Sequence, residues 1–152
     1  MVIVDDAVEA RARGWRTLAV LHGRLEAALE RELQARHELS VVEYTVLDAL
    51  SRQDGGHLRM QQLARATALS SSATTRLVTR LEDRGLAARV LCADDRRGIY
   101  TELTAAGTEL LQQARPTHDA TLARALASAA EAPELEGLVE ALSTLPAGHA
   151  TT

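Results

Sequence analysis

The chain has 152 residues, of which 46% are hydrophobic and 25% are charged, and its formal net charge is −4. This length fits one unit with a core of its own, which needs no disulfide or structural metal. The single cysteine, Cys92, excludes an intramolecular disulfide and a zinc site made of cysteines, and it is typical of a cytoplasmic protein. We expect no membrane span, because no apolar run is long enough, and the acidic pair after Val4 argues against a secretory signal.

All 17 basic residues are arginine, and eight of them fall within residues 57–98 together with only four acidic residues. This window therefore has a formal charge of +4 in a chain whose total is −4. A local basic surface on an acidic protein indicates a polyanionic partner for that part of the chain. The alternative is a solvated surface whose arginines are neutralised by salt bridges.

The first expected elements are two helices and a short strand. From residue 7 to about residue 36, apolar residues recur at steps of three and four, which predicts a long amphipathic helix. Ser40, with Glu43 three residues later, forms a capping box that predicts the start of a second helix. Residues 51–56 are polar and rich in glycine, as in a loop, and residues 57–59 predict a short strand.

Two shorter helices are expected next. The first covers about residues 60–68, and the serine run at residues 70–72 favours a break and a new helix start. The second runs to just before Gly85, which suits the residue that follows a helix end. One face of this second helix is expected to be buried and carries Thr74, Leu77, Val78 and Leu81. The other face is rich in polar groups, with Arg76 and Arg80 one turn apart.

A hairpin and two further helices complete the expected elements. Residues 88–92 and 99–103 predict two strands, joined by a tip whose aspartates and glycine favour a turn. A long helix is expected from Ala105 onward, and Pro116 inside it is expected to kink or break it. A last helix is expected over about residues 133–145, with a proline in its first turn.

This order of elements predicts a mainly α-helical winged helix-turn-helix fold, since two short helices joined by a tight turn precede a hairpin with a basic tip. The second helix of such a pair fits the major groove of DNA, where arginine can donate two hydrogen bonds to guanine. The hairpin tip reaches the adjacent minor groove, whose negative potential attracts arginine. The pattern therefore favours a protein that binds double-stranded DNA.

Three motifs make the sequence similar to the MarR family of bacterial transcriptional regulators, over about residues 40–112. They are a helix end at residues 81–86, Leu-Glu-Asp-Arg-Gly-Leu, a wing at residues 94–98, Asp-Asp-Arg-Arg-Gly, and a helix start at residues 103–107, Leu-Thr-Ala-Ala-Gly. The resemblance implies a homodimer that binds a pseudo-palindromic operator, usually as a repressor, and that often releases it when a small molecule binds. Ala68 departs from the family, which often has glycine in the turn between the two motif helices.

The resemblance also implies how the chain is organised. Residues 1–152 are expected to form a single unit, in which residues 40–104 are the winged helix-turn-helix DNA-binding lobe. The long helices at residues 7–37 and 105–146 are expected to form the dimerisation region, because family members associate through their first and last helices.

Carried over position by position, the resemblance implies a DNA interface on the second motif helix and on the wing. Arg76 is expected to contact a base edge and Arg80 a phosphate. In the wing, Asp95 is expected to brace Arg97 where it enters the minor groove. The full set of expected DNA-binding residues is Gln61, Gln62, Ser70, Ser71, Ser72, Thr74, Thr75, Arg76, Arg80, Asp95, Arg96 and Arg97.

Other kinds of site have weaker support in the sequence. Trp15, His22 and Tyr44 are candidates to line the pocket of a small-molecule effector, and the alternative for Trp15 is packing in a dimer interface. The histidines have no metal-ligand spacing and no catalytic constellation is visible, so we expect no metal, no cofactor and no enzyme activity. The remaining alternatives are a helical protein-interaction module, or a redox- or metal-responsive regulator of the same fold, for which Cys92 is the one candidate thiol.

Overall fold

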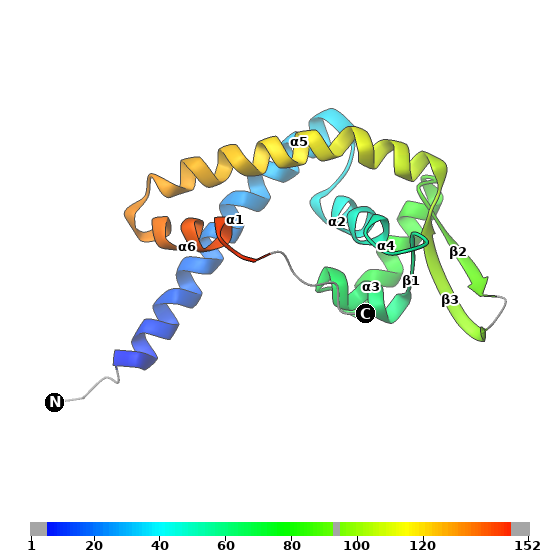
Figure 1. Ribbon diagram of the computed structural model, residues 1–152, viewed down its shortest axis with the longest axis horizontal. Helices are drawn as coiled ribbons and strands as arrows, with labels where there is room; N and C mark the ends of the chain where they lie inside the picture. The colour runs from blue at the N-terminus through cyan, green and yellow to red at the C-terminus, as the bar shows by residue number, and fades with distance from the viewer. Residues whose placement is uncertain (1–5, 93–94, 147–152) are drawn as a thin grey trace. The chain divides into compact units, whose positions relative to one another are not determined.

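A computed structural model of the chain describes residues 6–92 and 95–146, and at residues 92 and 95–97 it describes the backbone alone. Six helices and three strands follow one another in these ranges (Figure 1). In chain order they are α1 (Asp6–His37), α2 (Val41–Ser51), β1 (His57–Arg59), α3 (Met60–Thr67), α4 (Ser71–Asp83), β2 (Ala87–Cys92), β3 (Asp95–Leu103), α5 (Ala105–Ala130) and α6 (Pro133–Ser143). The strands form one antiparallel sheet in the order β1-β3-β2.

The chain divides into two compact units, and both α1 and α5 contribute to each of them. Glu30–His118 form the unit that we call the lobe, which contains α2, α3, α4 and the sheet. Met1–Leu29 and Asp119–Thr152 form the unit that we call the terminal-helix unit, which contains α6. No helix in the described ranges has both the length and the apolar character needed to cross a membrane.

The core of the lobe is formed by the apolar faces of its helices. Val46, Leu47 and Leu50 of α2 are fully buried, as are Leu63 of α3 and Leu81 of α4. Apolar residues at steps of three and four fall on one face of a helix, which explains how each helix turns leucine and valine inward. Removing this apolar surface from water is the main favourable contribution to the folding of the lobe.

Two partly buried ion pairs connect other elements of the lobe to α2. Arg84, just after α4, donates at 2.6 Å to Glu43, the carboxylate of the predicted capping box. Arg115 of α5 donates at 2.8 Å to Asp48. Burial alone would raise the pKa of the Glu43 and Asp48 carboxyls, but the hydrogen bonds and positive charges around them outweigh burial and lower both pKa values. Both carboxylates are therefore ionised at neutral pH and hold the helices together.

α3 and α4 end in the same way, with one residue in the left-handed backbone conformation. This residue is Gly85 after α4, with φ 72°, and Ala68 after α3, with φ 55°. The next amide then donates to a carbonyl five residues earlier, at 2.9 Å after Gly85 and at 3.0 Å after Ala68. The turn that a glycine often forms in the family is thus made with Ala68, at a cost of about 1–2 kcal/mol for the backbone conformation.

The start of α5 is joined to the end of α4. The hydroxyl of Thr104 accepts from the Gly107 amide at 3.0 Å and donates to the Gly85 carbonyl at 2.6 Å. Gly107 lies so close to Leu86 that a Cβ atom at position 107 would overlap the Leu86 carbonyl oxygen. We call this contact between Thr104, Gly107, Gly85 and Leu86 the α4–α5 joint.

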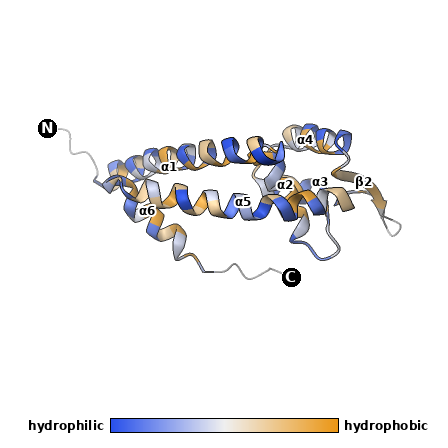
Figure 2. Cartoon of the chain, turned by 90° about the horizontal axis from the view of Figure 1, so that it is seen from above, coloured by the Kyte–Doolittle hydropathy of each residue, from blue (hydrophilic) through white to orange (hydrophobic). Residues whose placement is uncertain are grey.

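The terminal-helix unit has a smaller core. Leu21 of α1, Ala129 of α5, and Leu135 and Val139 of α6 are buried together. Hydrophobic and hydrophilic residues alternate along α1 (Figure 2), and part of its apolar side chains remain exposed. The large apolar side chains exposed in this unit are Val8, Trp15, Leu18, Val20, Leu142 and Leu145.

The predicted order of elements and the mainly helical fold with a winged hairpin are confirmed, with two local differences. β3 begins at Asp95, four residues earlier than predicted, because pairing resumes near the tip after a register shift next to Leu91. Pro116 lies inside a continuous α5 and does not break it. A proline removes a single backbone hydrogen bond, and here the helix continues past it.

Candidate nucleic-acid interface

α4 separates a buried face from an exposed one. Ser70 caps it by accepting a hydrogen bond from the Ala73 amide at 3.2 Å, so the helix starts where the serine run predicts. The buried face carries Leu77, Val78 and Leu81. The exposed side chains are those of Ser71, Ser72, Thr75, Arg76, Thr79, Arg80 and Asp83. The two serines and the two arginines can donate hydrogen bonds to phosphates and bases, whereas the hydroxyls of Thr75 and Thr79 already donate to carbonyls of α4.

Thr74 does not belong to the exposed face. Its side chain is 0% exposed, and its hydroxyl donates at 2.8 Å to the Ser70 carbonyl. Position 74 precedes Leu77 and Val78 by three and four residues, so it shares their buried face. The prediction that Thr74 contacts DNA is therefore wrong.

The arginines around α4 fall into two groups. Arg84 and Arg89 are bound to glutamates of the lobe, so their charge is used within the fold. Arg76 and Arg80 are exposed, and they make no ion pair or side-chain hydrogen bond with any residue that the structure describes. The sequence left open a surface whose arginines are neutralised by salt bridges. This alternative describes Arg84 and Arg89, and it does not describe Arg76 and Arg80.

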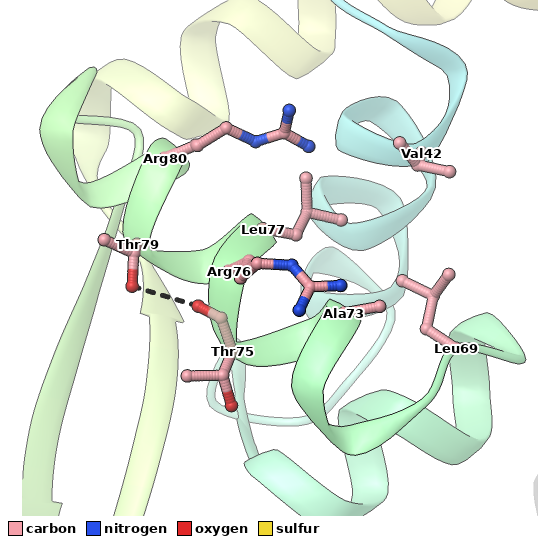
Figure 3. Close-up of a pocket in the computed structure, with 8 residues that line it drawn as sticks. All are labelled: Val42, Leu69, Ala73, Thr75, Arg76, Leu77, Thr79 and Arg80. Carbon is pink, nitrogen blue, oxygen red and sulfur yellow. Dashed lines mark hydrogen bonds between the residues drawn. The ribbon is translucent and has the colours of Figure 1, made fainter.

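The exposed face of α4 has two edges (Figure 3). Thr75 and Thr79 lie on the edge beside the strands, where the Thr79 hydroxyl donates at 3.0 Å to the Thr75 carbonyl. Arg76 and Arg80 extend over the other edge, toward Val42 of α2. A groove of about 600 Å³ lies there, with an apolar floor and both guanidinium groups at its rim. The lining residues are Val42, Leu69, Ala73, Thr75, Arg76, Leu77, Thr79 and Arg80.

Further donors gather where α3 meets the start of α4. Gln61 and Arg65 of α3 line a shallow depression together with Ser70 and Ser71. The first amides of a helix lack partners within the helix and carry its positive dipole end, which favours a phosphate at this position. Gln62 differs from Gln61, because its side-chain oxygen accepts a backbone amide at 3.0 Å and caps α3.

The wing is the hairpin formed by β2 and β3. Its pairing is regular up to Leu91, which lies opposite Ile99, and the register shifts directly afterwards. The side chains at residues 95–97 lie outside the described part of the chain. The predicted brace of Arg97 by Asp95 therefore stays a prediction, as does the role of the arginine between them.

Arg89 of β2 holds the wing against α4, a role that its position in the sequence does not predict. Its guanidinium donates to the Glu82 carboxylate, to the Thr75 carbonyl at 3.1 Å and to the Thr79 hydroxyl at 2.9 Å. These three acceptors lie along one side of α4, so one side chain fixes the base of the hairpin to the helix. In the sequence, this contact could be inferred only from the position of Arg89 seven residues after Glu82, with Gly85 between them. That spacing indicates a contact only once the fold is known.

The residues predicted to line an effector pocket have different environments. Trp15 and His22 lie exposed on α1, and the His22 ring is 3.5 Å from the Glu26 carboxylate. Tyr44 belongs to the lobe, is 4% exposed and stacks on His118 with the ring centroids 4.2 Å apart. Tyr44 is buried and one of its faces is occupied, and its place among the effector-lining residues stays a prediction.

The metal- and redox-responsive alternatives gain no structural support. Among the described side chains, no group of three or more histidine, cysteine or acidic residues could hold a metal ion. The side chain of Cys92 lies outside the described part of the chain. The groups that the structure does bring together are thus the hydroxyls and guanidinium groups of α4 and the donors at its start.

The fold and this surface define a winged helix-turn-helix DNA-binding protein. Residues 37–98 match the MarR family. AbsC, a MarR family transcriptional regulator from Streptomyces coelicolor, is 32% identical, and the match covers 93% of each chain with a TM-score of 0.74. Sco3205, a regulator of the same family and organism whose structure was solved in complex with DNA, is 28% identical, with a TM-score of 0.74 over 94% of this chain and 88% of that chain.

A curated relative that is similar in sequence is also a helix-turn-helix regulator by name. The uncharacterised HTH-type transcriptional regulator YkoM of Bacillus subtilis (strain 168) is 32% identical over 89 residues. These residues span 59% of this chain and 56% of the relative. The chain belongs to the MarR family, a family of DNA-binding transcriptional regulators and not of enzymes.

Proposed function

We propose that the protein is a homodimeric regulator that binds a pseudo-palindromic operator through α4 and the wing. The observation that carries the proposal is the exposed face of α4. There, Arg76 and Arg80 have no partner among the described side chains, while nearby arginines are neutralised by glutamates. Unpaired guanidinium groups beside hydroxyls match the base acceptors and the phosphates that border the major groove.

The positions along α4 suggest separate roles for its side chains. Arg76 lies in the first half of the helix, the part that contacts bases in helix-turn-helix proteins, so we assign it to a base edge. Arg80 lies one turn later and is assigned to a phosphate. The serines at residues 70–72, Thr75 and the free amides of the first turn add phosphate contacts, with Gln61 beside them.

A second copy of the chain is the proposed partner of the terminal-helix unit. Val8, Trp15 and Leu18 of α1 are 50%, 72% and 44% exposed. They lie on one side of the helix, because Trp15 follows Val8 by about two turns and Leu18 is the three-residue neighbour of Trp15. Exposed apolar patches of this kind mark association surfaces, and a two-fold dimer would match the two half-sites of a pseudo-palindrome.

The proposal includes repression that a small effector relieves, as the resemblance to the family implies. His22 lies seven residues after Trp15 and so on the same face of α1, and we assign it to the effector pocket, whereas Trp15 is assigned to the dimer surface above. Screening small molecules for loss of operator binding tests this assignment. An active compound should release the wild-type protein and should act less well on a His22→Ala variant.

The wing is proposed to place Arg97 in the minor groove, with Asp95 as its brace. Removing the negative charge in Asp95→Ala should strengthen DNA binding if simple electrostatics decides. The brace predicts the opposite, because an unheld arginine must be ordered on binding. We expect weaker operator binding at an almost unchanged melting temperature, and equal or tighter binding would contradict the brace.

The central test compares two arginine variants on two kinds of DNA. Wild-type protein first selects its operator from a random duplex library, and binding is then titrated on this operator and on random duplex. Arg76→Ala should lose about 1–3 kcal/mol of binding free energy on the operator and much less on random duplex. Arg80→Ala should lose a similar amount on both. Selection that yields no preferred sequence would overturn the proposed function.

A further inference from the structure

The face of the wing that contacts α4 continues toward the tip with exposed aliphatic side chains. Directly opposed residues of an antiparallel pair point to the same face, and alternate pairs share that face. From base to tip, the pairs on this face are Ala87–Leu103, Arg89–Thr101 and Leu91–Ile99. Thr101 is 0% exposed, whereas Leu91 is 78% exposed and Ile99 is 48% exposed. The pattern that buries the base of the hairpin thus continues beyond the part that the lobe covers.

Arg89 establishes where this exposed pair lies relative to α4. Its guanidinium reaches Thr75 and Thr79, on the edge of α4 nearest the wing. Leu91 points to the same face two residues farther along β2, which is about 7 Å closer to the tip. In Figure 1 the hairpin extends away from the helices of the lobe. The aliphatic pair therefore flanks the space between the exposed face of α4 and the wing tip.

This space has a definite occupant when a winged helix-turn-helix protein binds DNA. With α4 in the major groove and the wing tip in the adjacent minor groove, the sugar–phosphate strand that separates the two grooves must pass between them. Arginines and hydroxyls can bind its phosphates, but the deoxyribose rings present C–H groups. Aliphatic side chains are suited to contact those rings, because both surfaces lose water in the contact.

We propose that Leu91 and Ile99 form an apolar contact for the deoxyribose rings of the strand that passes between α4 and the wing. The proposal rests on the proposed DNA-binding mode. Residues 57–98 carry a formal charge of +4, so a second copy on this face would bring like charges together, whereas DNA is opposite in sign. The regular pairing also ends at this pair, and such irregularities commonly re-aim side chains next to functional sites.

The test uses threonine substitutions, because threonine is β-branched and favoured in strands, and its hydroxyl replaces apolar surface. Leu91→Thr, Ile99→Thr and the double variant are compared with Val90→Thr, a control on the opposite face of the same strand. Operator affinity is measured over a range of salt concentrations. We expect the double variant to lose about tenfold in affinity while the slope of affinity against salt stays unchanged, because no phosphate contact and no counterion is lost.

Hydroxyl-radical cleavage reports directly on the accessibility of deoxyribose hydrogens. The wild-type protein and Val90→Thr should protect the sugars between the two grooves, and the double variant should leave them exposed while still protecting the rest of the site. A double variant that binds and protects DNA as Val90→Thr does would overturn the proposal, and so would a change in its mass in solution, which would assign the pair to protein association. Failure of the wild-type protein to select any DNA would instead be a failure of the proposed function.

Discussion

The lobe and the terminal-helix unit are built from the same few residue types but hold together in different ways. In the lobe, acidic side chains bind arginines from other elements, as Glu43 of α2 binds Arg84 at the end of α4. In the terminal-helix unit, the pair formed by Glu9 and Arg16 lies within α1, and both side chains are largely exposed. Such exposed pairs contribute little, about 0–1 kcal/mol, to stability.

The two units also differ in how completely they bury their apolar side chains. The helices of the lobe bury leucine and valine completely, whereas Trp15, the one tryptophan of the chain, is 72% exposed on α1. One chain thus covers the apolar surface of the lobe, whereas apolar side chains of α1 stay exposed, and the proposed dimer would cover them with a second copy. Operator binding should then depend on protein concentration through dimerisation.

The largest effect should come from placing charges on the exposed apolar face of α1. Trp15→Glu combined with Leu18→Glu should give a monomer in light scattering. Operator affinity should fall by about 10²–10⁴-fold, because two linked half-sites are replaced by one. The lobe should keep its helical circular dichroism. Arg24→Glu changes the net charge by the same amount on the other side of α1, and a similar loss of dimer in this control would contradict the assigned face.

The same glycine-to-alanine change should have opposite signs in the two units. Gly107→Ala places a Cβ on the Leu86 carbonyl and should destabilise the lobe by about 3 kcal/mol in denaturant titration. Gly137 of α6 has open space around its Cβ position, so Gly137→Ala should stabilise by about 0.5–1 kcal/mol through helix propensity. Equal effects of the two variants would remove the contrast in packing between the units.

Removing the charge of Glu43 should weaken the lobe by about 2 kcal/mol, since Arg84 then keeps a neutral partner and the capping box is weakened. Glu43→Gln is the variant, and the free energy of unfolding from denaturant titration is the measurement. Glu9→Gln is its counterpart in the terminal-helix unit and should change stability by less than about 0.5 kcal/mol.

The same carboxylate should make the stability of the lobe depend on pH. The folded protein lowers the pKa of Glu43 and of Asp48, so their contribution is complete above the ordinary carboxyl range and is lost as the pH falls below about 4.5. Thermal melts from pH 7 to pH 3 should show this loss. The melting temperature of Glu43→Gln should fall less over the same interval, and parallel curves would contradict the role of Glu43.

The smallest effect concerns the turn between α3 and α4. Ala68→Gly should stabilise the lobe by about 1 kcal/mol, because the left-handed backbone costs glycine nothing, although a more flexible unfolded chain offsets part of the gain. Gly85→Ala tests the same geometry at the end of α4 and should destabilise by a similar amount. Denaturant titration gives the change in the free energy of unfolding for both variants. Changes of the same sign would contradict the shared turn geometry.

The elements could be predicted from the sequence because their signals are local. The capping box at Ser40, the serine run before α4 and Gly85 each act within one turn of a helix. The failures involve context. Pro116 does not break α5, because the loss of one hydrogen bond leaves the helix continuous, and a kink at Pro116 stays a prediction. The burial of Thr74 was predicted from the same periodicity that turns Leu77 and Val78 inward, and only its assignment to DNA is wrong.

In the candidate site, too, local features could be predicted from the sequence and contacts between elements could not. The exposed arginines of α4 follow from the periodicity of one helix, so the sequence was sufficient to place them on one face. Arg89 could not be assigned in this way, because its acceptors Thr75 and Thr79 lie in another element and 14 and 10 residues away in the chain. Whether an arginine is paired within the fold or free for DNA depends on such contacts, which residue spacing does not specify.

The residues of the α4–α5 joint, which carry the resemblance to the family, are different from the residues proposed to contact DNA. Thr104, Gly107 and Gly85 belong to the motifs that make the sequence resemble its family, and they bind one another and not solvent-facing partners. None of the residues of that joint lies on the exposed face of α4. In the proposed binding mode, mutations at Arg76 can therefore retune the operator without loosening the joint, so regulators that share these motifs are free to diverge in the genes they control.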